Sequence, residues 1–465
     1  MRFLIECTYV YEHPQDNSGI QRVVRNVIKQ LDGLHSEVEC IPVMMHGGML
    51  YRVLSLTPLK PQKQTPLRQA AIIRLDHMRN RYWWWHSRLE RLRPFSTSHA
   101  ARRLLFVLGK LLGLAITLPL RVALWLNRNA QPAPERAVPL QVEEGDQLLL
   151  LDSSWHADFF ELAERLKRRG VGIVSVIYDL IPLTHPQFCD AGLVKVFDRW
   201  FDWIAQTADG FMAISQTISE QVERELQQRL GIDEASRRWH GHFHLGCELD
   251  LNYAEAPLHP GLRRMFAKRE PVYLMVSTVE PRKNHAYLLD AFERLWAQGS
   301  KARLCIIGKV GWKCEALLER INQHPLNGKR LFMFNRVNDR SLEHAYSRAR
   351  ALVFPSHAEG FGLPLVEAMQ RGLPVMASDI PVFREVGGDF MAYFDLADPQ
   401  SLVRLIQAFE ASGQFPAARP VVEWQWVDWR GAAGQLIAGA SNGLRRSAPA
   451  LQANQANQVS YADCP

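Results

Sequence analysis

Short apolar segments alternate with amphipathic, helix-period stretches along most of the chain, in two separate series. The first series comprises residues 2–10, 147–154, 172–180 and 210–215, and the second comprises 272–278, 302–308, 331–337, 351–356 and 374–379. Strands that alternate with helices form parallel sheets covered by those helices. The pattern therefore predicts an α/β protein with two domains built on parallel sheets, and two packed domains imply a cleft between them.

The chain length agrees with two domains, because 465 residues exceed what a single ordinary core holds. We expect the first domain over 1–250 and the second over 251–420, followed by a helix over 421–440. The last segment, 441–465, is polar and poor in aromatic residues. Such a composition buries too little apolar surface to fold, and it predicts a disordered tail.

The alternation breaks between residues 51 and 139, where the chain is rich in Pro, Gln and Arg. This part holds a Trp triplet at 83–85 and a long apolar segment at 104–126. Between Lys60 and Arg136 there are 15 Lys and Arg against three acidic residues, a local charge of +12 in a chain whose formal charge is +7. We interpret 51–139 as a basic, apolar insertion in the first domain.

Segment 104–126 is long enough to span a bilayer, since about 20 apolar residues suffice. Lys110, Pro119 and Arg121 interrupt it, and a charge at the bilayer centre is costly. A helix lying in the interface would bury its leucines while its basic residues reach anionic headgroups. The segment therefore predicts attachment to an anionic membrane surface; a buried helical hairpin is the alternative.

The seven cysteines are scattered and have no C-x-x-C spacing, which disfavours a disulfide framework and a zinc site and favours a reducing cytosol. Residues 1–14 contain Glu6 within the apolar run and lack a small-residue cleavage site, so they read as a first strand and not as a signal peptide. These features predict a cytoplasmic location.

Two other clusters suggest chemistry. His240, His242 and His244 would share one face of a strand, as a metal tripod requires, but no carboxylate or cysteine completes the set and no metal is expected. The tryptophans at 83–85 could stack on nucleic-acid bases, yet no nucleic-acid-binding module accompanies them. We expect no nucleic-acid partner.

The stretch HAEGFGLPLVEAMQRG, residues 357–372, places two glutamates around a glycine-rich turn between a buried strand and a helix. Gly360 and Gly362 let the backbone approach a ligand closely, and a helix N-terminus attracts phosphate. A glycosidase-type carboxylate pair would flank the scissile bond from opposite sides. Glu359 and Glu367 instead suit one ligand held along its length.

Several segments in order resemble family 4 of the retaining glycosyltransferases, which have the two-Rossmann GT-B fold. The resemblance is carried by 357–389, by VSTVEPRKNHAYLLDAF at 276–292, by the approach at 338–356 and by SGIQRVVRNVIKQL at 18–31. It covers most of the chain and implies a nucleoside-diphosphate sugar as donor, without a bound metal or other cofactor.

The resemblance implies a role for each matching position of the glycine-rich turn. Glu359 would contact the donor hexose hydroxyls, and Glu367 would accept hydrogen bonds from the ribose. Backbone N–H groups of three residues would hold the diphosphate and the sugar: Phe361, Gly362 and Leu363. Gly19 would let the first domain's loop approach the reaction centre.

Lys283 would offset the charge of the leaving diphosphate, and positive groups at this place agree with that chemistry. Many relatives carry Gly-Arg where this chain has Ser277-Thr278. Arg282 is our substitute for the missing arginine, although neighbouring residues on an extended segment point opposite ways, so that only one of the pair need face the phosphate.

Many relatives also carry His-Asp near the first domain's reaction centre, where this chain reads VIYDLIPLTHP. Asp179 keeps a candidate catalytic role near donor or acceptor, and His185 is a weaker candidate.

The resemblance thus implies a retaining, metal-independent hexosyltransferase of bacterial polysaccharide or lipopolysaccharide synthesis. VIYDLIPLTHP and TVEPRKN are most similar to mannosyl- and rhamnosyl-transferring members, which favours a GDP-sugar such as GDP-mannose and leaves UDP-sugars open. A lipid-linked glycan acceptor would explain the basic insertion and a peripheral location on the inner face of the plasma membrane. A GT-B nucleotide-sugar epimerase and an inactive sugar-nucleotide-binding scaffold are the alternatives.

Overall fold

A computed structural model describes most of the chain. The described residues are 1–14, 19–34, 38–56, 67–90, 99–129, 136–152, 154–156, 159–248, 257–335 and 337–460. The chain divides into two compact units: the larger joins 1–43 to 142–465, and the smaller is 44–141.

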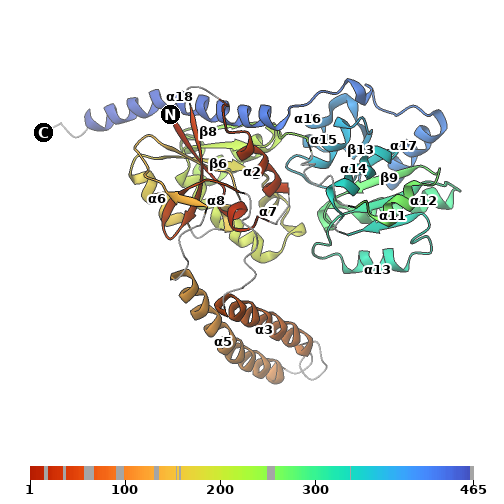
Figure 1. The fold of residues 1–465 in the computed structure, drawn as a ribbon, viewed down its shortest axis with the longest axis horizontal. Helices are drawn as coiled ribbons and strands as arrows, with labels where there is room; N and C mark the ends of the chain where they lie inside the picture. The colour runs from red at the N-terminus through yellow and green to blue at the C-terminus, as the bar shows by residue number, and fades with distance from the viewer. Residues whose placement is uncertain are drawn as a thin grey trace. The chain divides into compact units, whose positions relative to one another are not determined.

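From β2 to β8 the first sheet is parallel and runs in the order β2-β1-β5-β6-β7-β8. Strands β6 and β8 of this sheet are labelled in Figure 1. Its inner strands are buried almost throughout, as expected for a sheet with helices on both faces. The strands are β1 (Arg2–Glu6), β2 (Glu39–His46), β5 (Gln147–Leu150), β6 (Gly172–Ile177), β7 (Gly210–Ala213) and β8 (Trp239–His242). The helices are α1 (Thr8–Glu12), α2 (Gly19–Lys29), η1 (Ser154–His156), α6 (Phe160–Arg168), α7 (Ile181–Thr184), η2 (Pro186–Phe188), α8 (Ala191–Thr207), α9 (Gln216–Leu230) and α10 (Ile232–Ala235).

The second sheet has the doubly wound order β11-β10-β9-β12-β13-β14, and all its pairs are parallel. The strands are β9 (Val272–Val276), β10 (Arg303–Ile307), β11 (Leu331–Phe334), β12 (Ala351–Phe354), β13 (Val375–Ser378) and β14 (Ala392–Phe394). The helices are α11 (Pro260–Phe266), η3 (Pro281–Lys283), α12 (His285–Ala297), α13 (Glu315–Gln323), α14 (Asp339–Arg348), α15 (Leu363–Gln370), α16 (Pro381–Gly387), η4 (Gly388–Phe390), α17 (Pro399–Ser412) and η5 (Val421–Glu423).

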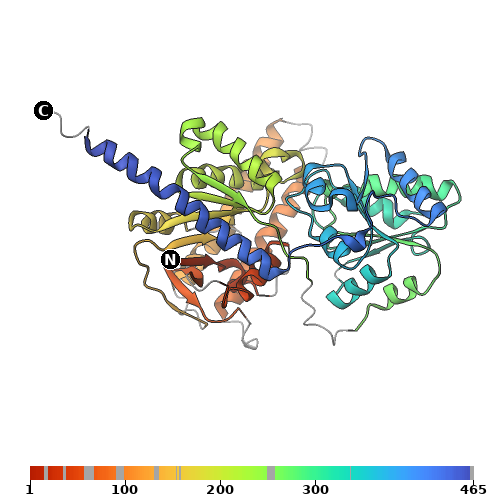
Figure 2. The same ribbon diagram turned by 90° about the horizontal axis from the view of Figure 1, so that it is seen from above.

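Every segment predicted as a strand contains one, and the two parallel sheets confirm the predicted pair of Rossmann-like domains. Helices cover both sheets, and α18, the blue C-terminal helix, lies along the first domain (Figure 2). The predicted border between the domains, at 250–251, lies outside the described residues.

The C-terminal segment differs from the prediction, because one helix, α18, runs from Trp429 to Ser460. It replaces the expected helix over 421–440 and the expected disordered tail over 441–465, of which 461–465 lie outside the described residues. The helix packs on β7, β8 and α2 of the first domain, and Leu436 and Ile437 are fully buried there. Low hydrophobicity suggested disorder, whereas Ala, Gln, Leu and Arg in this segment favour a helix.

The smaller unit, 44–141, consists of a strand pair and two long helices. Strands β3 (Met49–Val53) and β4 (Ala137–Pro139) pair antiparallel. Helices α3 (Leu67–Glu90) and α5 (His99–Asn129) pack on each other, and the Tyr82 hydroxyl donates to the Gly109 carbonyl at 2.8 Å. Within α5, Leu105–Val122 is long and apolar enough to cross a membrane, as core helices of soluble proteins can also be.

Candidate functional site

The glycine-rich turn connects β12 to α15, as predicted. Gly362 has a φ of 101°, which only glycine adopts readily, and α15 begins at Leu363 with Pro364 in its first turn. Gly360 has no room for a side chain, because a Cβ there would lie 2.0 Å from the Tyr178 carbonyl oxygen of the first domain. The turn is thus shaped by its glycines and lies directly against the end of β6.

Glu359 lies in a cluster of charged side chains with Lys283 and Arg282. Lys283 Nζ donates to Glu359 Oε1, and Arg282 Nη1 lies 2.7 Å from Glu359 Oε2. Arg282 also donates to the Ala358 carbonyl and to Glu280 Oε1, each at 2.7 Å. The structure therefore brings together three of the predicted site residues.

The prediction that Arg282 and Lys283 point opposite ways is wrong, because both contact Glu359. The segment Pro281–Lys283 is a 3₁₀ turn and not an extended strand, so neighbouring side chains need not lie on opposite faces. Asn284 ends the turn in the left-handed conformation, and its side chain caps α12.

Burial and charge act against each other in this cluster. Burial raises the pKa of the Glu359 carboxyl, but Arg282 and Lys283 outweigh burial and hold that pKa at about 2. Burial, together with the charge of Arg282, lowers the pKa of Lys283. Glu359 is thus an ionised acceptor, paired with the cation that we predicted for the leaving group.

Glu367 lies inside α15, buried, and its two oxygens have different partners. Arg22 of α2 donates to Oε1 at 2.5 Å, and the Tyr346 hydroxyl of α14 donates to Oε2 at 2.7 Å. Glu359 and Glu367 therefore hold different cations. The sequence prediction missed Arg22 and Tyr346; Arg22 follows Gly19 by three residues, on the same side of a helix, which was the available signal.

Asp179 follows β6 and accepts a hydrogen bond from the Ile181 amide at 3.0 Å. Burial raises its pKa, while the charges of Arg282 and Lys283 lower it, so Asp179 lies within electrostatic reach of the charged cluster. His185 is hydrogen-bonded to Thr184 and stacks on Phe188, which stacks in turn on His357 of the second domain. The weaker candidate, His185, thus lies in an aromatic stack.

The other predicted residues, Gly19 and Phe361–Leu363, lie at the starts of α2 and α15. Gly19 begins α2, and a Cβ at this position would lie 3.9 Å from Leu363 Cδ1. The Phe361 ring is buried, with its centroid 5.9 Å from that of Trp426. The backbone of Phe361, Gly362 and Leu363 thus leads into the N-terminus of α15, where first-turn N–H groups lack intrahelical acceptors.

A buried carboxyl pair in the first domain was not predicted. Glu6 is the last residue of β1 and Asp152 follows β5, so both lie at the carboxyl ends of parallel strands, where open α/β sheets bind ligands. Glu6 Oε2 accepts from the Asp152 amide at 3.1 Å, and Glu6 Oε1 from the Thr8 amide at 2.7 Å. Burial and the charge of Asp152 raise the pKa of Glu6 to about 7. The signal was the interruption of an apolar strand by Glu6.

Two of the three histidines at 240–244 have separate polar partners. His244 Nε2 lies 2.9 Å from Glu385 Oε1, and His240 Nδ1 lies 3.3 Å from the Ser219 hydroxyl. Among the described residues, no group of three or more His, Cys, Asp or Glu side chains is placed to hold a metal ion.

Comparison with known proteins gives a family match in the second domain. Residues 263–419 match the family model described as "Glycosyl transferases group 1". The "Serotype-specific mannosyltransferase WbdA" of Escherichia coli is 32% identical over 305 residues, which are 64% of this chain and 37% of that protein. The "O-antigen chain mannosyltransferase B" of Escherichia coli is 25% identical over 62% of this chain and 73% of that protein.

A solved structure of Anabaena Alr3699/HepE in complex with UDP and glucose covers 64% of this chain and 77% of its own, at 17% identity and a TM-score of 0.48. The chain spans 37% of the length of the WbdA protein that it matches. Residues 263–419 are thus similar to glycosyl transferases of group 1, and the two Rossmann-like domains agree with the predicted GT-B fold.

Proposed function

We propose that this protein is a retaining glycosyltransferase that moves a hexose from a nucleoside-diphosphate sugar to a glycan in bacterial polysaccharide synthesis. Mannose is the sugar that we favour. The observation that carries the proposal is the contact of Lys283 and Arg282 with Glu359 at the glycine-rich turn of a group 1 domain. The O-antigen mannosyltransferases among its relatives support the choice of sugar.

The proposed chemistry uses charges that the chain itself supplies. Lys283 and Arg282 would stabilise the departing diphosphate together with the N-terminus of α15. Donor binding would exchange the pairing of Glu359 with Lys283 for hydrogen bonds to the hexose hydroxyls. The leaving phosphate oxygen would help to take the acceptor proton on the same face of the sugar, which retains the anomeric configuration.

We expect GDP-mannose to raise the melting temperature more than UDP-glucose at equal concentration, since a ligand that binds only the folded state stabilises it in proportion to the logarithm of its concentration over Kd. We also expect mannosyl transfer to persist in EDTA. The measurements are thermal shift with a panel of nucleotide sugars and transfer assays with and without the chelator. Stabilisation by no nucleotide sugar would refute the function, and a strict divalent-cation requirement would refute the metal-independent mechanism.

We further propose that the smaller unit attaches the enzyme to the inner face of the plasma membrane, next to a lipid-linked acceptor. In the Leu105–Val122 window of α5, 19% of the residues are buried, and Leu112, Leu114 and Leu118 are each 57% exposed. This exposure disfavours the core-helix alternative. Arg and Lys near an anionic surface each contribute about 1 kcal/mol.

Deleting most of the smaller unit should abolish binding to anionic vesicles, because the apolar face and most of the +12 charge are lost with it. Strands β3 and β4 pair, and the Leu54 amide donates to the Arg136 carbonyl, so a short Gly-Ser loop can replace residues 56–135. The measurement is flotation with vesicles that contain anionic lipid, at low and high salt.

The double variant Leu112→Glu, Leu118→Glu should weaken flotation, whereas Leu54→Glu, an equally exposed change outside α5, should not. Wild type that fails to float at low salt, or a deletion variant that floats as well as wild type, would rule out membrane attachment through this unit.

A further inference from the structure

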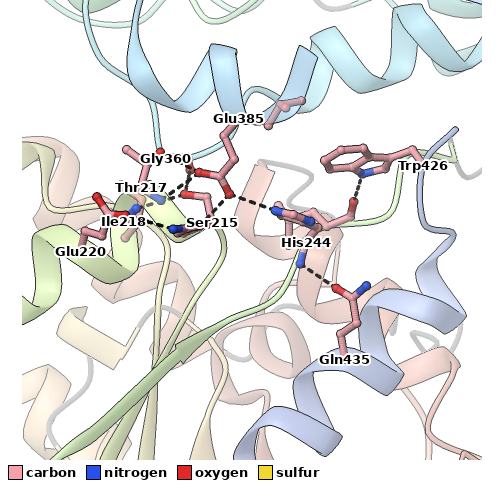
Figure 3. A network of polar contacts seen from close by, with 12 residues as sticks. Ser215, Thr217, Ile218, Glu220, His244, Gly360, Glu385, Trp426 and Gln435 are labelled. Carbon is pink, nitrogen blue, oxygen red and sulfur yellow. Dashed lines mark hydrogen bonds and ion pairs between the residues drawn. The ribbon is translucent and has the colours of Figure 1, made fainter. Parts of the chain in front are cut away.

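A polar joint connects the two Rossmann-like domains and reaches the glycine-rich turn beside the charged cluster. We call it the Glu385 joint; it consists of Ser215, Gln216, Thr217, His244, Gly360 and Glu385 (Figure 3). Glu385 lies on α16 of the second domain and faces the start of α9 of the first. Its carboxylate accepts from the Gln216 amide at 2.7 Å, from the Thr217 amide at 2.8 Å and from the Thr217 hydroxyl at 2.6 Å.

The chemistry of this contact favours an ionised carboxylate. The first N–H groups of a helix lack intrahelical acceptors and carry the positive end of the helix dipole, so an anion there is stabilised. Burial raises the pKa of Glu385, but the hydrogen bonds from His244 and Thr217 outweigh burial and hold that pKa at about 2. A residue of the second domain thus caps a fifteen-residue helix of the first.

Ser215 extends the joint to the glycine-rich turn. Its hydroxyl donates to the Gly360 carbonyl at 2.9 Å and accepts from the Ile218 amide at 3.2 Å, and the side chain is fully buried. Gly360 also touches the Tyr178 carbonyl, which leaves no space for a side chain. The residue next to Glu359 is therefore held by the first domain at two points.

His244 brings the later part of the chain into the same joint. Its ring lies against that of Trp426, with centroids 4.9 Å apart, and Trp426 Nε1 donates to the Leu245 carbonyl at 2.8 Å. The His244 amide donates to Gln435 Oε1 of α18 at 3.0 Å. Figure 3 shows His244 between Glu385, Trp426 and Gln435. The segment that leaves the first domain after β8 and the segment that returns to it before α18 thus meet at the Glu385 joint.

On the basis of the proposed function, we propose that Glu385 and Ser215 are positioning residues for sugar transfer. The Glu385 joint fixes the Gly360–Leu363 turn against the first domain, and so places the donor hexose held by that turn against the acceptor. Neither side chain touches the donor in this role. Each acts through Gly360, which is why loss of the joint should affect turnover more than nucleotide affinity.

The test uses the full chain with Glu385→Gln, Ser215→Ala and Glu385→Asp. The amide of Glu385→Gln is neutral and turns an NH₂ toward backbone donors. We expect kcat to fall about tenfold or more in the first two variants, as a misplaced reacting group would cause. The Kd for GDP should stay within about twofold of wild type, and Glu385→Asp, which keeps the carboxylate, should recover part of kcat.

Hydrogen exchange supplies a measurement that does not need activity. Exchange at the Gln216 and Thr217 amides should rise in Glu385→Gln, and exchange over 358–363 should rise with it. The matched control is Asp379→Asn, which removes the exposed pair with Arg384 of α16 and should leave both kcat and exchange unchanged.

Wild-type kcat in both Glu385→Gln and Ser215→Ala would overturn the proposal, and so would losses of kcat and GDP affinity of equal size. If wild type transfers no sugar, the proposed function fails on its own. The joint is then judged by exchange alone: unchanged exchange over 358–363 in Glu385→Gln would overturn it, and raised exchange would support it.

Discussion

Replacing Lys283 by alanine is expected to lower kcat by a factor on the order of 10² or more, as removal of one preorganised electrostatic donor does. The Lys283 side chain is 12% exposed and lies beside Glu359 and Arg282, where a lowered local dielectric strengthens its effect on developing phosphate charge. The affinity for the intact donor should fall less than kcat, because the leaving group gains charge in the transition state. The measurement is steady-state kinetics with saturating acceptor.

Lys301→Ala is the matched control, since Lys301 is an exposed cation of the same domain. It should leave kcat unchanged. A Lys283→Ala enzyme that is folded by circular dichroism and retains wild-type kcat would exclude the leaving-group role, and Arg282 would then be the cation to examine.

Replacing Glu367 by alanine should weaken donor binding by roughly 1.5–3 kcal/mol, the range for hydrogen bonds to a charged acceptor. In the structure the Glu367 carboxylate already accepts from Arg22 and Tyr346, so a ribose hydroxyl must share or replace one of these donors. A double-mutant cycle separates the ribose contact from this rearrangement. Its four measurements are the Kd values of wild type and Glu367→Ala for GDP and for a GDP analogue without the ribose hydroxyls.

Removal of the ribose hydroxyls should weaken binding to wild type and hardly change binding to Glu367→Ala. Glu293→Ala, which removes an ion pair with Arg320 elsewhere in the second domain, should behave like wild type. If Glu367→Ala weakened binding of GDP and of the analogue by the same factor, the carboxylate would stabilise the protein and make no hydrogen bond to the ribose.

The sequence predicted the strands and the glycine-rich turn because these depend on neighbouring residues. The apolar runs of the second domain and the placement of Gly362 and Pro364 are local signals. Contacts between domains have no such signal: Arg22 and Glu367 are 345 positions apart, and Ser215 and Gly360 are 145 apart.

The errors have physical causes of the same kind. We predicted extended backbone through Pro281–Lys283, with side chains alternating from side to side, but a 3₁₀ turn begins at this proline. The C-terminal segment is too polar to fold alone. It forms a helix because its apolar side packs on β7, β8 and α2 of the first domain.

The course of α18 has a consequence for exchanging parts between related enzymes. A chimera that takes its donor half from a relative, and ends with it, would lose the helix that covers β7 and β8 of the acceptor half. Trp429, Leu436 and Ile437 would no longer shield that surface, which would be left open to aggregation. Such a chimera should keep residues from Trp429 onward with their native first domain and place its second junction before them, so that the exchanged module is an internal segment of the chain.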